Sequence, residues 1–406
     1  MLPKKRIVLF FLLGFFFHIT SGFAQKTQYY WYRAIAAIEN EDLNVAKVWL
    51  DSAIIQNPKN ADYLLKLGEV YFLEEDFESA LGVFQQVEKQ KAGIASLWLA
   101  KTYALQGEKS KAIEELKRHL GTSEKKPEAE ILLDPAFDIL KISIEWTELW
   151  KNEYYSINDK FLAEVAYLFS RNNLNEIVDA LSVRIEKSRT NHRLFALRGE
   201  AFFKLGSFKS AEADFSEAIK RSKRNPTYYE WRAKCRFNLK QYKGALKDIN
   251  EAISLSEGNP KYLIIRAEAF SGMGNYADAA IDVKVYLTFY PNNIKSHLQL
   301  AHISFESSNY LDALFALGKV IRSGNANADC YELRGIIYTK SENWELAQAD
   351  FTKAIEMEPK RAKALGLRGE MLIKQGKAQL GCVDLKKAIE LGNFTAQELF
   401  YKHCRK

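Results

Sequence analysis

Hydrophobic, small and polar positions recur with a period of 34 residues through the second half of the chain. In each of six copies, a small residue is followed twelve positions later by a second small residue and sixteen positions later by a large apolar one. The first small residues are Gly199, Ala233, Ala267, Ala301, Gly335 and Gly369. The second small residues are Ala211, Ala245, Ala279, Ala313, Ala347 and Gly381. The large apolar residues are Phe215, Ile249, Val283, Leu317, Phe351 and Leu385. An unchanged spacing indicates one structural unit repeated without insertion.

This pattern resembles the tetratricopeptide repeat (TPR), a 34-residue helix–turn–helix unit. An aromatic residue also marks the turn between the two halves of five copies: Phe208, Tyr242, Tyr276, Tyr310 and Trp344. The resemblance implies an all-α fold, a right-handed superhelix or α-solenoid of about ten repeats. The small residues fit this expectation, because only Gly or Ala lets two helices cross closely while a bulky side chain fills the space beside them. Each helix pair must then stack on a neighbour to bury its apolar side.

Looser copies and two other segments flank the regular run. We expect about three repeats in residues 25–122, a helical, aromatic-rich insert in 123–158, a degenerate repeat in 159–191, six regular repeats in 192–394 and a capping helix in 395–406. Helical periodicity is visible in the degenerate repeat, but the sequence does not fix its phase.

Charged positions follow the same period. Five copies carry an arginine directly before the first small residue: Arg198, Arg232, Arg266, Arg334 and Arg368. Sixteen positions later the same copies carry Asp214, Asp248, Asp282, Asp350 and Asp384. The sixth copy lacks both charges, with Leu300 and Ala316 in their places. Because a lone charge in a half-buried helix interface is costly, we expect Arg–Asp pairs within or between repeats. The alternative is two independent exposed columns of charge, which would contribute little.

The amino terminus has the layout of a secretory signal peptide. Met1–Arg6 carries three positive charges, Ile7–Phe17 is apolar apart from one glycine, and small residues precede a cut after Ala24. The apolar run is short for a membrane span, so we favour a cleaved signal over an uncleaved anchor. We expect an exported protein that is periplasmic, associated with the cell envelope or secreted.

Removal of this segment lowers the formal net charge from +7 by three charges to +4. No basic block remains that would indicate nucleic-acid binding. We expect contact with a membrane only through a partner or an uncleaved signal.

The insert carries Trp146 and Trp150, one helical turn apart. Before them, Asp134 and Pro135 are typical of a helix N-cap followed by its first turn. Segments of this kind resemble those of exported bacterial TPR proteins. Two interpretations stay open: the aromatic side chains pack on the ends of both repeat arrays, or they form a docking patch for a partner.

Four cysteines follow the signal. Cys382 and Cys404 lie almost equally far from a turn at Gly392, so in a helical hairpin they would face each other. An exported protein can form disulfides, and we therefore predict a bridge between them. The alternative is two free cysteines at a helix contact. Cys235 and Cys330 are almost three repeats apart and should be unpaired.

Catalytic signatures are missing from the sequence. His297 and His302 are five residues apart, which does not suit a zinc pair on one helical face, and no Cys-x-x-Cys, phosphate-binding loop or nucleophile elbow occurs. We expect neither enzymatic activity nor a cofactor or metal.

In TPR proteins the first helix of each repeat lines a concave face. The resemblance places these residues there: Glu200, Phe203, Lys204, Glu230, Lys234, Phe237, Glu268, His302, Phe305, Glu332 and Lys340. Apolar anchors mixed with charges suit an extended peptide or a helix. We therefore expect a scaffold or adaptor that binds partner proteins. The alternatives are a solvated inner face without a partner, or a ligand-sensing or regulatory subunit that binds a small molecule or glycan.

Overall fold

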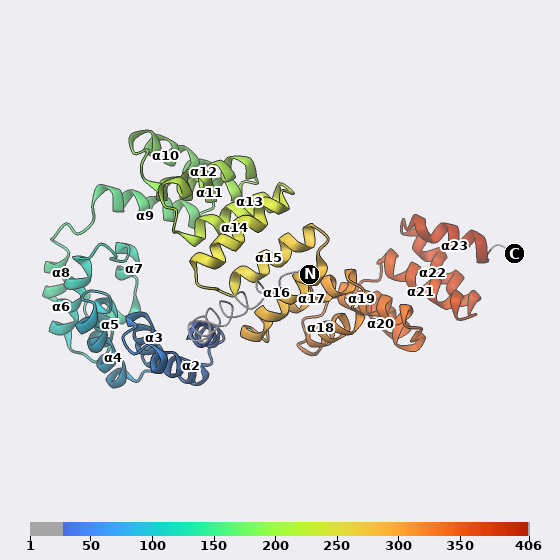
Figure 1. Ribbon diagram of the computed structural model, residues 1–406, viewed down its shortest axis with the longest axis horizontal. Coiled ribbons are helices and arrows are strands. Elements are labelled where there is room, and N and C mark those ends of the chain that lie inside the picture. The colour runs from blue at the N-terminus through green and yellow to red at the C-terminus, as the bar shows by residue number, and fades with distance from the viewer. Residues whose placement is uncertain (1–26, 405–406) are drawn as a thin grey trace, which may run out of the picture. The chain divides into compact units, whose positions relative to one another are not determined.

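The computed structural model describes residues 27–404, and the expected signal peptide lies outside these residues. The described chain is helical throughout and contains no strand, so the predicted all-α solenoid is confirmed (Figure 1). By its contacts it divides into two compact units. One extends to Trp231 and includes Ser254–Asn259, and the other comprises Arg232–Ile253 and the residues from Pro260 onward. No helix within residues 27–404 is both long enough and apolar enough to cross a membrane.

The first unit begins with three helical hairpins. Their helices are residues 27–39 with α2 (Leu43–Gln56), α3 (Ala61–Leu73) with α4 (Phe77–Gln90), and α5 (Ser96–Leu105) with α6 (Lys109–Leu120). Each second helix buries a small residue and a larger one: Ala46 and Leu50, Ala80 and Phe84, Ala112 and Leu116. The apolar side of each hairpin is therefore covered by stacking on its neighbours.

The insert consists of α7 (Glu128–Leu132), a 3₁₀ turn η1 (Pro135–Phe137) and α8 (Ile144–Leu149). Asp134 caps the turn by accepting a hydrogen bond from the Ala136 backbone N–H at 2.9 Å, as expected for an N-cap. Its carboxylate also lies 2.6 Å from Lys101 Nζ, which fastens the insert to α5.

Trp146 is a core residue of the first unit. Its side chain is 6% exposed and packs against Phe137 and Trp150, with ring centroids 6.0 and 5.6 Å apart. These rings extend the hydrophobic cluster of α5 and α6 through Leu116 and Leu120. The insert's aromatic side chains therefore pack on the end of the first array. A docking patch built on Trp146 is not what the structure shows, because burial leaves its ring no free face.

The degenerate repeat is formed by α9 (Ile157–Ser170) and α10 (Leu174–Lys187). Val165, Ile177 and Leu181 are fully or almost fully buried, and they lie 34 residues before Gly199, Ala211 and Phe215. This correspondence fixes the phase that the sequence left open. Two bulky β-branched residues replace the small ones, and α9 and α10 contact each other less extensively than the helices of regular hairpins such as α11 and α12.

The regular run consists of six hairpins and a cap. The first helices are α11 (His192–Lys204), α13 (Pro226–Asn238), α15 (Lys261–Gly272), α17 (Ile294–Glu306), α19 (Ala328–Lys340) and α21 (Ala362–Lys374). The second helices are α12 (Phe208–Arg221), α14 (Tyr242–Leu255), α16 (Tyr276–Phe289), α18 (Tyr310–Arg322), α20 (Trp344–Met357) and α22 (Ala378–Glu390). The cap is α23 (Phe394–Cys404), and a disulfide joins its Cys404 to Cys382 on α22. Cys235 and Cys330 are buried and form no disulfide within residues 27–404.

Small residues lie where the two helices of a hairpin cross, as the sequence predicts. A Cβ atom added at Gly199 would lie 3.0 Å from the Phe215 ring. One added at Gly369 would lie 2.8 Å from the backbone oxygen of Gly381. Glycine therefore sets how closely these helices approach, and the bulky residue four positions after the second small one fills the remaining space.

The Arg–Asp pairs form within each repeat, so the predicted contact is confirmed. In all five copies the arginine donates through Nε and Nη2 to both carboxylate oxygens, at 2.6–2.9 Å. The five aspartates are 2–7% exposed. The hydrogen bond to Asp214 raises the pKa of Arg198 above its ordinary value, so this guanidinium stays charged. Each pair is a bidentate bond between the two helices of its own hairpin.

Arg198, Arg266 and Arg368 also bond to the hairpin before their own. Nη1 of Arg198 donates to Ser182 Oγ at 3.0 Å, and Nη1 of Arg368 donates to Thr352 Oγ1 at 3.0 Å. Nη1 of Arg266 donates to Asn250 Oδ1 at 3.2 Å. Each acceptor lies sixteen residues before its arginine, on the preceding second helix. We call the five Arg–Asp pairs the ladder. It therefore connects consecutive repeats as well as the two helices of one repeat.

Candidate functional site

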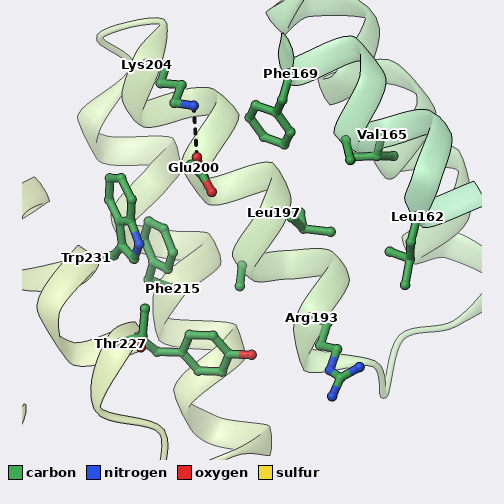
Figure 2. Close-up of a pocket in the computed structure, with 13 residues that line it drawn as sticks. Leu162, Val165, Phe169, Arg193, Leu197, Glu200, Lys204, Phe215, Thr227 and Trp231 are labelled. Atoms are coloured by element: carbon green, nitrogen blue, oxygen red, sulfur yellow. Dashed lines mark ion pairs between the residues drawn. The ribbon is translucent and has the colours of Figure 1, made fainter. Parts of the chain in front are cut away.

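An apolar cavity of about 580 Å³ lies between three consecutive first helices of the first unit, α9, α11 and the start of α13 (Figure 2). Its lining is Leu162, Val165, Ala166, Phe169, Arg193, Ala196, Leu197, Glu200, Lys204, Phe215, Thr227, Tyr228 and Trp231. First helices line the concave face in the TPR arrangement that the sequence resembles. The cavity therefore lies on the face where partner binding is expected.

One wall of the cavity is a single face of α9. Leu162, Val165 and Phe169 are three or four residues apart, so their side chains project from the same side of the helix toward Leu197 on α11 (Figure 2). The wall lies on the degenerate repeat, where α9 and α10 contact each other less extensively than α11 and α12 do. The cavity thus coincides with the irregularity in the array.

The opposite wall is built on Trp231. Its ring stacks on Phe215, with an interplanar angle of 6° and a centroid distance of 5.8 Å. Phe203 meets the edge of the same ring at 5.2 Å. Phe203, which the sequence places in the groove, therefore supports Trp231 and is not itself part of the lining.

Glu200 and Lys204 line the cavity, and they form an ion pair with each other at 2.9 Å. Their role in binding a partner stays a prediction. Lys204 Nζ also lies 4.7 Å from the centre of the Phe169 ring, a cation–π contact that links α11 to α9. Their charges are therefore compensated locally, near one end of the cavity in Figure 2.

Arg193 lies at the other end, where the first cavity adjoins a second one of about 420 Å³. The second cavity is lined by Ser123, Lys125, Pro127, Glu128, Tyr155, Asp159, Lys160, Leu162, Ala163, Ala166 and Arg193. Leu162, Ala166 and Arg193 line both. The two cavities thus form one groove along α9, reaching from Trp231 to the insert.

Sequence reasoning did not select α9, Trp231 or Arg193. Arg193 occupies the second position of its repeat, a position that points into the groove. The unresolved phase of residues 159–191 hid the contribution of Leu162, Val165 and Phe169, since their facing could not be assigned.

The remaining predicted groove residues lie on α13, α15, α17 and α19, and their role in binding stays a prediction. Phe237 packs on Tyr242, and Phe305 packs on Tyr310. Glu268 is half-buried, and this burial raises the pKa of its carboxyl group. His302 is exposed. Neither of the two cavities along α9 is lined by any member of this set: Glu230, Lys234, Phe237, Glu268, His302, Phe305 and Lys340.

Glu332 does not belong to an open groove. It is 3% exposed, and its carboxylate accepts from Arg361 Nε and Lys363 Nζ, each at 2.7 Å. These cations come from α21 and the residue before it, so the carboxylate stabilises the packing of α19 against the next hairpin. Its burial and pairing leave it unavailable to a partner.

Residues 27–404 contain no group of three or more His, Cys, Asp or Glu side chains arranged to hold a metal ion.

Several solved structures align with the chain. The C-terminal part of a TPR protein from Cytophaga hutchinsonii aligns with a TM-score of 0.50 and 16% identity, over 58% of this chain and 98% of its own. A TPR protein from Parabacteroides merdae aligns with a TM-score of 0.45 and 20% identity, over 61% of this chain and 98% of its own. A chain of the Cut9–Hcn1 hetero-tetramer of the APC/C aligns with a TM-score of 0.45 and 10% identity, over 93% of this chain and 96% of its own.

No curated protein matches the chain by sequence. A family model described as tetratricopeptide repeat matches residues 33–93, 74–129, 197–260 and 332–381, which together make up just over half of the 406 residues. The matched segments include helices of both units. The chain is therefore a member of the tetratricopeptide repeat family.

Proposed function

We propose that this protein is a non-enzymatic scaffold or adaptor of the bacterial cell envelope, which holds a peptide or helix of a partner protein in its concave groove. TPR arrays are typically interaction scaffolds and not catalysts. Beyond this general role, we propose the envelope setting and the binding of a peptide or helix in the groove.

The observation that carries the proposal is the apolar cavity between α9, α11 and α13. Soluble proteins seldom leave a sizeable apolar hollow open to water unless something binds there. Phe169 and Trp231 offer flat apolar surfaces, and the ion pair of Glu200 and Lys204 supplies a polar rim. Such a combination suits side-chain anchors of a polypeptide.

The shape of the cavity favours a polypeptide over a small molecule or glycan. An enclosed pocket would suit a small ligand, because such ligands bury most of their surface. Here the lining residues Ala166, Arg193 and Thr227 are exposed, so the cavity is open along its length. It also continues into the second cavity at Arg193, as a chain-like ligand requires.

The envelope setting rests on the amino-terminal sequence up to Ala24 and is supported by the Cys382–Cys404 disulfide, since such bonds persist in oxidising compartments. Cell fractionation with amino-terminal sequencing tests it. We expect a mature chain that begins at Gln25 in the periplasmic or membrane fraction. A cytoplasmic chain that retains Met1 would contradict this part of the proposal.

Site-specific photo-crosslinking in intact cells tests the binding mode. A photoreactive amino acid at Ala166, exposed in the groove, should capture a defined partner protein. The matched control is Val183 on the second helix α10, which is 57% exposed and outside both cavities. Equal capture at both positions, or capture only at Val183, would refute binding in the groove.

A further inference from the structure

The groove along α9 carries a charge pattern that identifies the chemistry of its occupant. Two ion pairs neutralise part of its lining: Lys204 with Glu200 at 2.9 Å and Lys125 with Asp159 at 3.5 Å. Arg193 and Lys160 have no ion pair within residues 27–404, and both are exposed. Glu128, on the insert side, is the one carboxylate of the lining without an ion pair in the same range. The groove therefore presents an excess of positive charge.

The position of Arg193 makes its charge useful for recognition. It lines both cavities, so a ligand that passes from one to the other must pass its guanidinium. The neighbouring His192 does not share this role. It is hydrogen-bonded to Tyr228 Oη through Nδ1 at 2.7 Å, and burial followed by the Arg193 charge lowers its pKa, which disfavours the charged imidazolium.

Apolar and charged parts of the groove are separate. The walls of the larger cavity are apolar around Leu197 and Trp231, while Arg193 lies at one end (Figure 2). Arg193 also lines the second cavity, together with Lys160. A guanidinium without a partner binds a carboxylate through paired N–H donors. A side chain that fills the apolar part would bury its surface against Phe169 and Trp231.

We propose that the groove selects an acidic peptide segment of a partner protein, whose apolar side chain enters the cavity beside Trp231 and whose neighbouring Asp or Glu carboxylate binds Arg193. This deepens the proposed function and rests on it. The recognition depends on one arginine at the junction of two cavities, and the rest of the segment follows α9 toward the insert, where Lys160 adds a second positive charge.

A displayed library of random peptides, selected on the mature chain from Gln25 to Lys406, tests the proposal. We expect the selected peptides to be enriched in an aromatic or aliphatic residue close to Asp or Glu. The affinity of the best synthetic peptide is then measured for four folded variants. Arg193→Glu should weaken binding about tenfold or more, because it replaces attraction by repulsion. Arg193→Lys should retain part of the affinity.

Two controls make the result specific. Arg224→Glu changes an exposed arginine that lines neither cavity and should leave the affinity unchanged. Ala166→Trp fills the groove with a bulky side chain and should abolish binding. A peptide whose acidic residue is changed to lysine should regain affinity for Arg193→Glu, which a merely structural effect of that substitution would not produce.

The outcomes separate the two proposals. If Ala166→Trp abolishes binding but Arg193→Glu does not weaken it, or if the selected peptides lack acidic residues, the acidic specificity is wrong and groove binding stands. If no peptide is selected, or if Ala166→Trp leaves binding unchanged, both the specificity and the proposed binding mode are wrong.

Discussion

Arg198 holds Asp214 through two hydrogen bonds of 2.8 Å, from Nε and Nη2, across the two helices of one hairpin. The same guanidinium donates to Ser182 of the preceding hairpin, so a single side chain fixes three helices. Its aspartate is 4% exposed. An ion pair of this kind is more than a surface contact, since removing one partner leaves the other charge poorly solvated.

The ladder should therefore show strong energetic coupling. In the pair Arg266 and Asp282, Asp282→Ala should lower the free energy of unfolding by about 3 kcal/mol. A double-mutant cycle on the two positions, measured by urea denaturation, should give a coupling energy on the order of 1–3 kcal/mol. The matched control is the exposed pair Lys353 and Glu356, for which about 0.5 kcal/mol or less is expected. Equal coupling in both pairs would show that burial of the ladder has no energetic effect.

The glycine at a helix crossing should resist substitution. Gly369→Ala places a Cβ 2.8 Å from the Gly381 backbone oxygen, so the helices must separate, at a cost of about 1–3 kcal/mol. Gly318→Ala on α18 is the control. Its Cβ would meet only the flexible end of Arg322 at 3.4 Å, and the higher helix propensity of alanine should stabilise the protein by up to about 1 kcal/mol. Thermal melts that shift in the same direction for both variants would contradict this account of the crossing.

The disulfide between Cys382 and Cys404 can be detected by alkylation and mass spectrometry, which count the labelled cysteines. Unfolded protein that has not been reduced should take up label at two cysteines, Cys235 and Cys330, and reduced protein should take up label at four. The bridge closes a loop with a sequence separation of 22, which in the chain-entropy description stabilises by about 3 kcal/mol. Cys404→Ser should lower the stability accordingly. Four labelled cysteines before reduction would mean that the bridge is absent from the protein.

His119 should make the first unit sensitive to acid. The side chain is 6% exposed, and its Nε2 accepts from the Lys126 backbone N–H at 2.9 Å, which requires the neutral imidazole. Burial first, and then the charges of Lys126, Lys101 and Lys125, lowers the pKa of His119 to about 4.

The sign of the effect follows from linkage. Between pH 6.5 and about 4 the unfolded chain binds a proton that the folded His119 does not, so stability falls as the pH falls through this range. At pH 5 the loss relative to pH 7 is roughly 1–2 kcal/mol. His119→Gln, which keeps a hydrogen-bond acceptor, should reduce that difference in urea midpoints. An unchanged difference would assign the acid sensitivity to other groups.

Sequence patterns predicted those features that the repeat imposes on every copy. Arg198 and Asp214 could be paired because a repeat that loses one charge loses the other, and Gly199 could be placed at a crossing because its small size recurs every 34 residues. Trp146 could not be assigned, since an aromatic residue in an irregular segment suits a core and a surface equally well. Its burial depends on how the insert folds back on α5 and α6.

The groove escaped prediction for a related physical reason. It lies along α9 of the degenerate repeat. In this repeat Val165 and Ile177 replace the two small residues that define the position of each regular copy, so the sequence pattern did not show which side of α9 faces inward. The ion pairs of Glu332 could not be predicted either, because its partners Arg361 and Lys363 do not recur with the period of the repeat. The features that the sequence did not predict, the groove along α9 and the ion pairs of Glu332, therefore lie where the chain departs from the repeat pattern.

Hydrogen–deuterium exchange of the chain from Gln25 to Lys406, with and without the partner captured at Ala166, shows directly whether the groove along α9 is the binding surface. We expect the bound partner to slow amide exchange in the first helices α9, α11 and α13, while the second helices α10 and α12 exchange as in the free chain. Protection confined to α10 and α12, or no protection in either set, would contradict the claim that this groove is the binding surface.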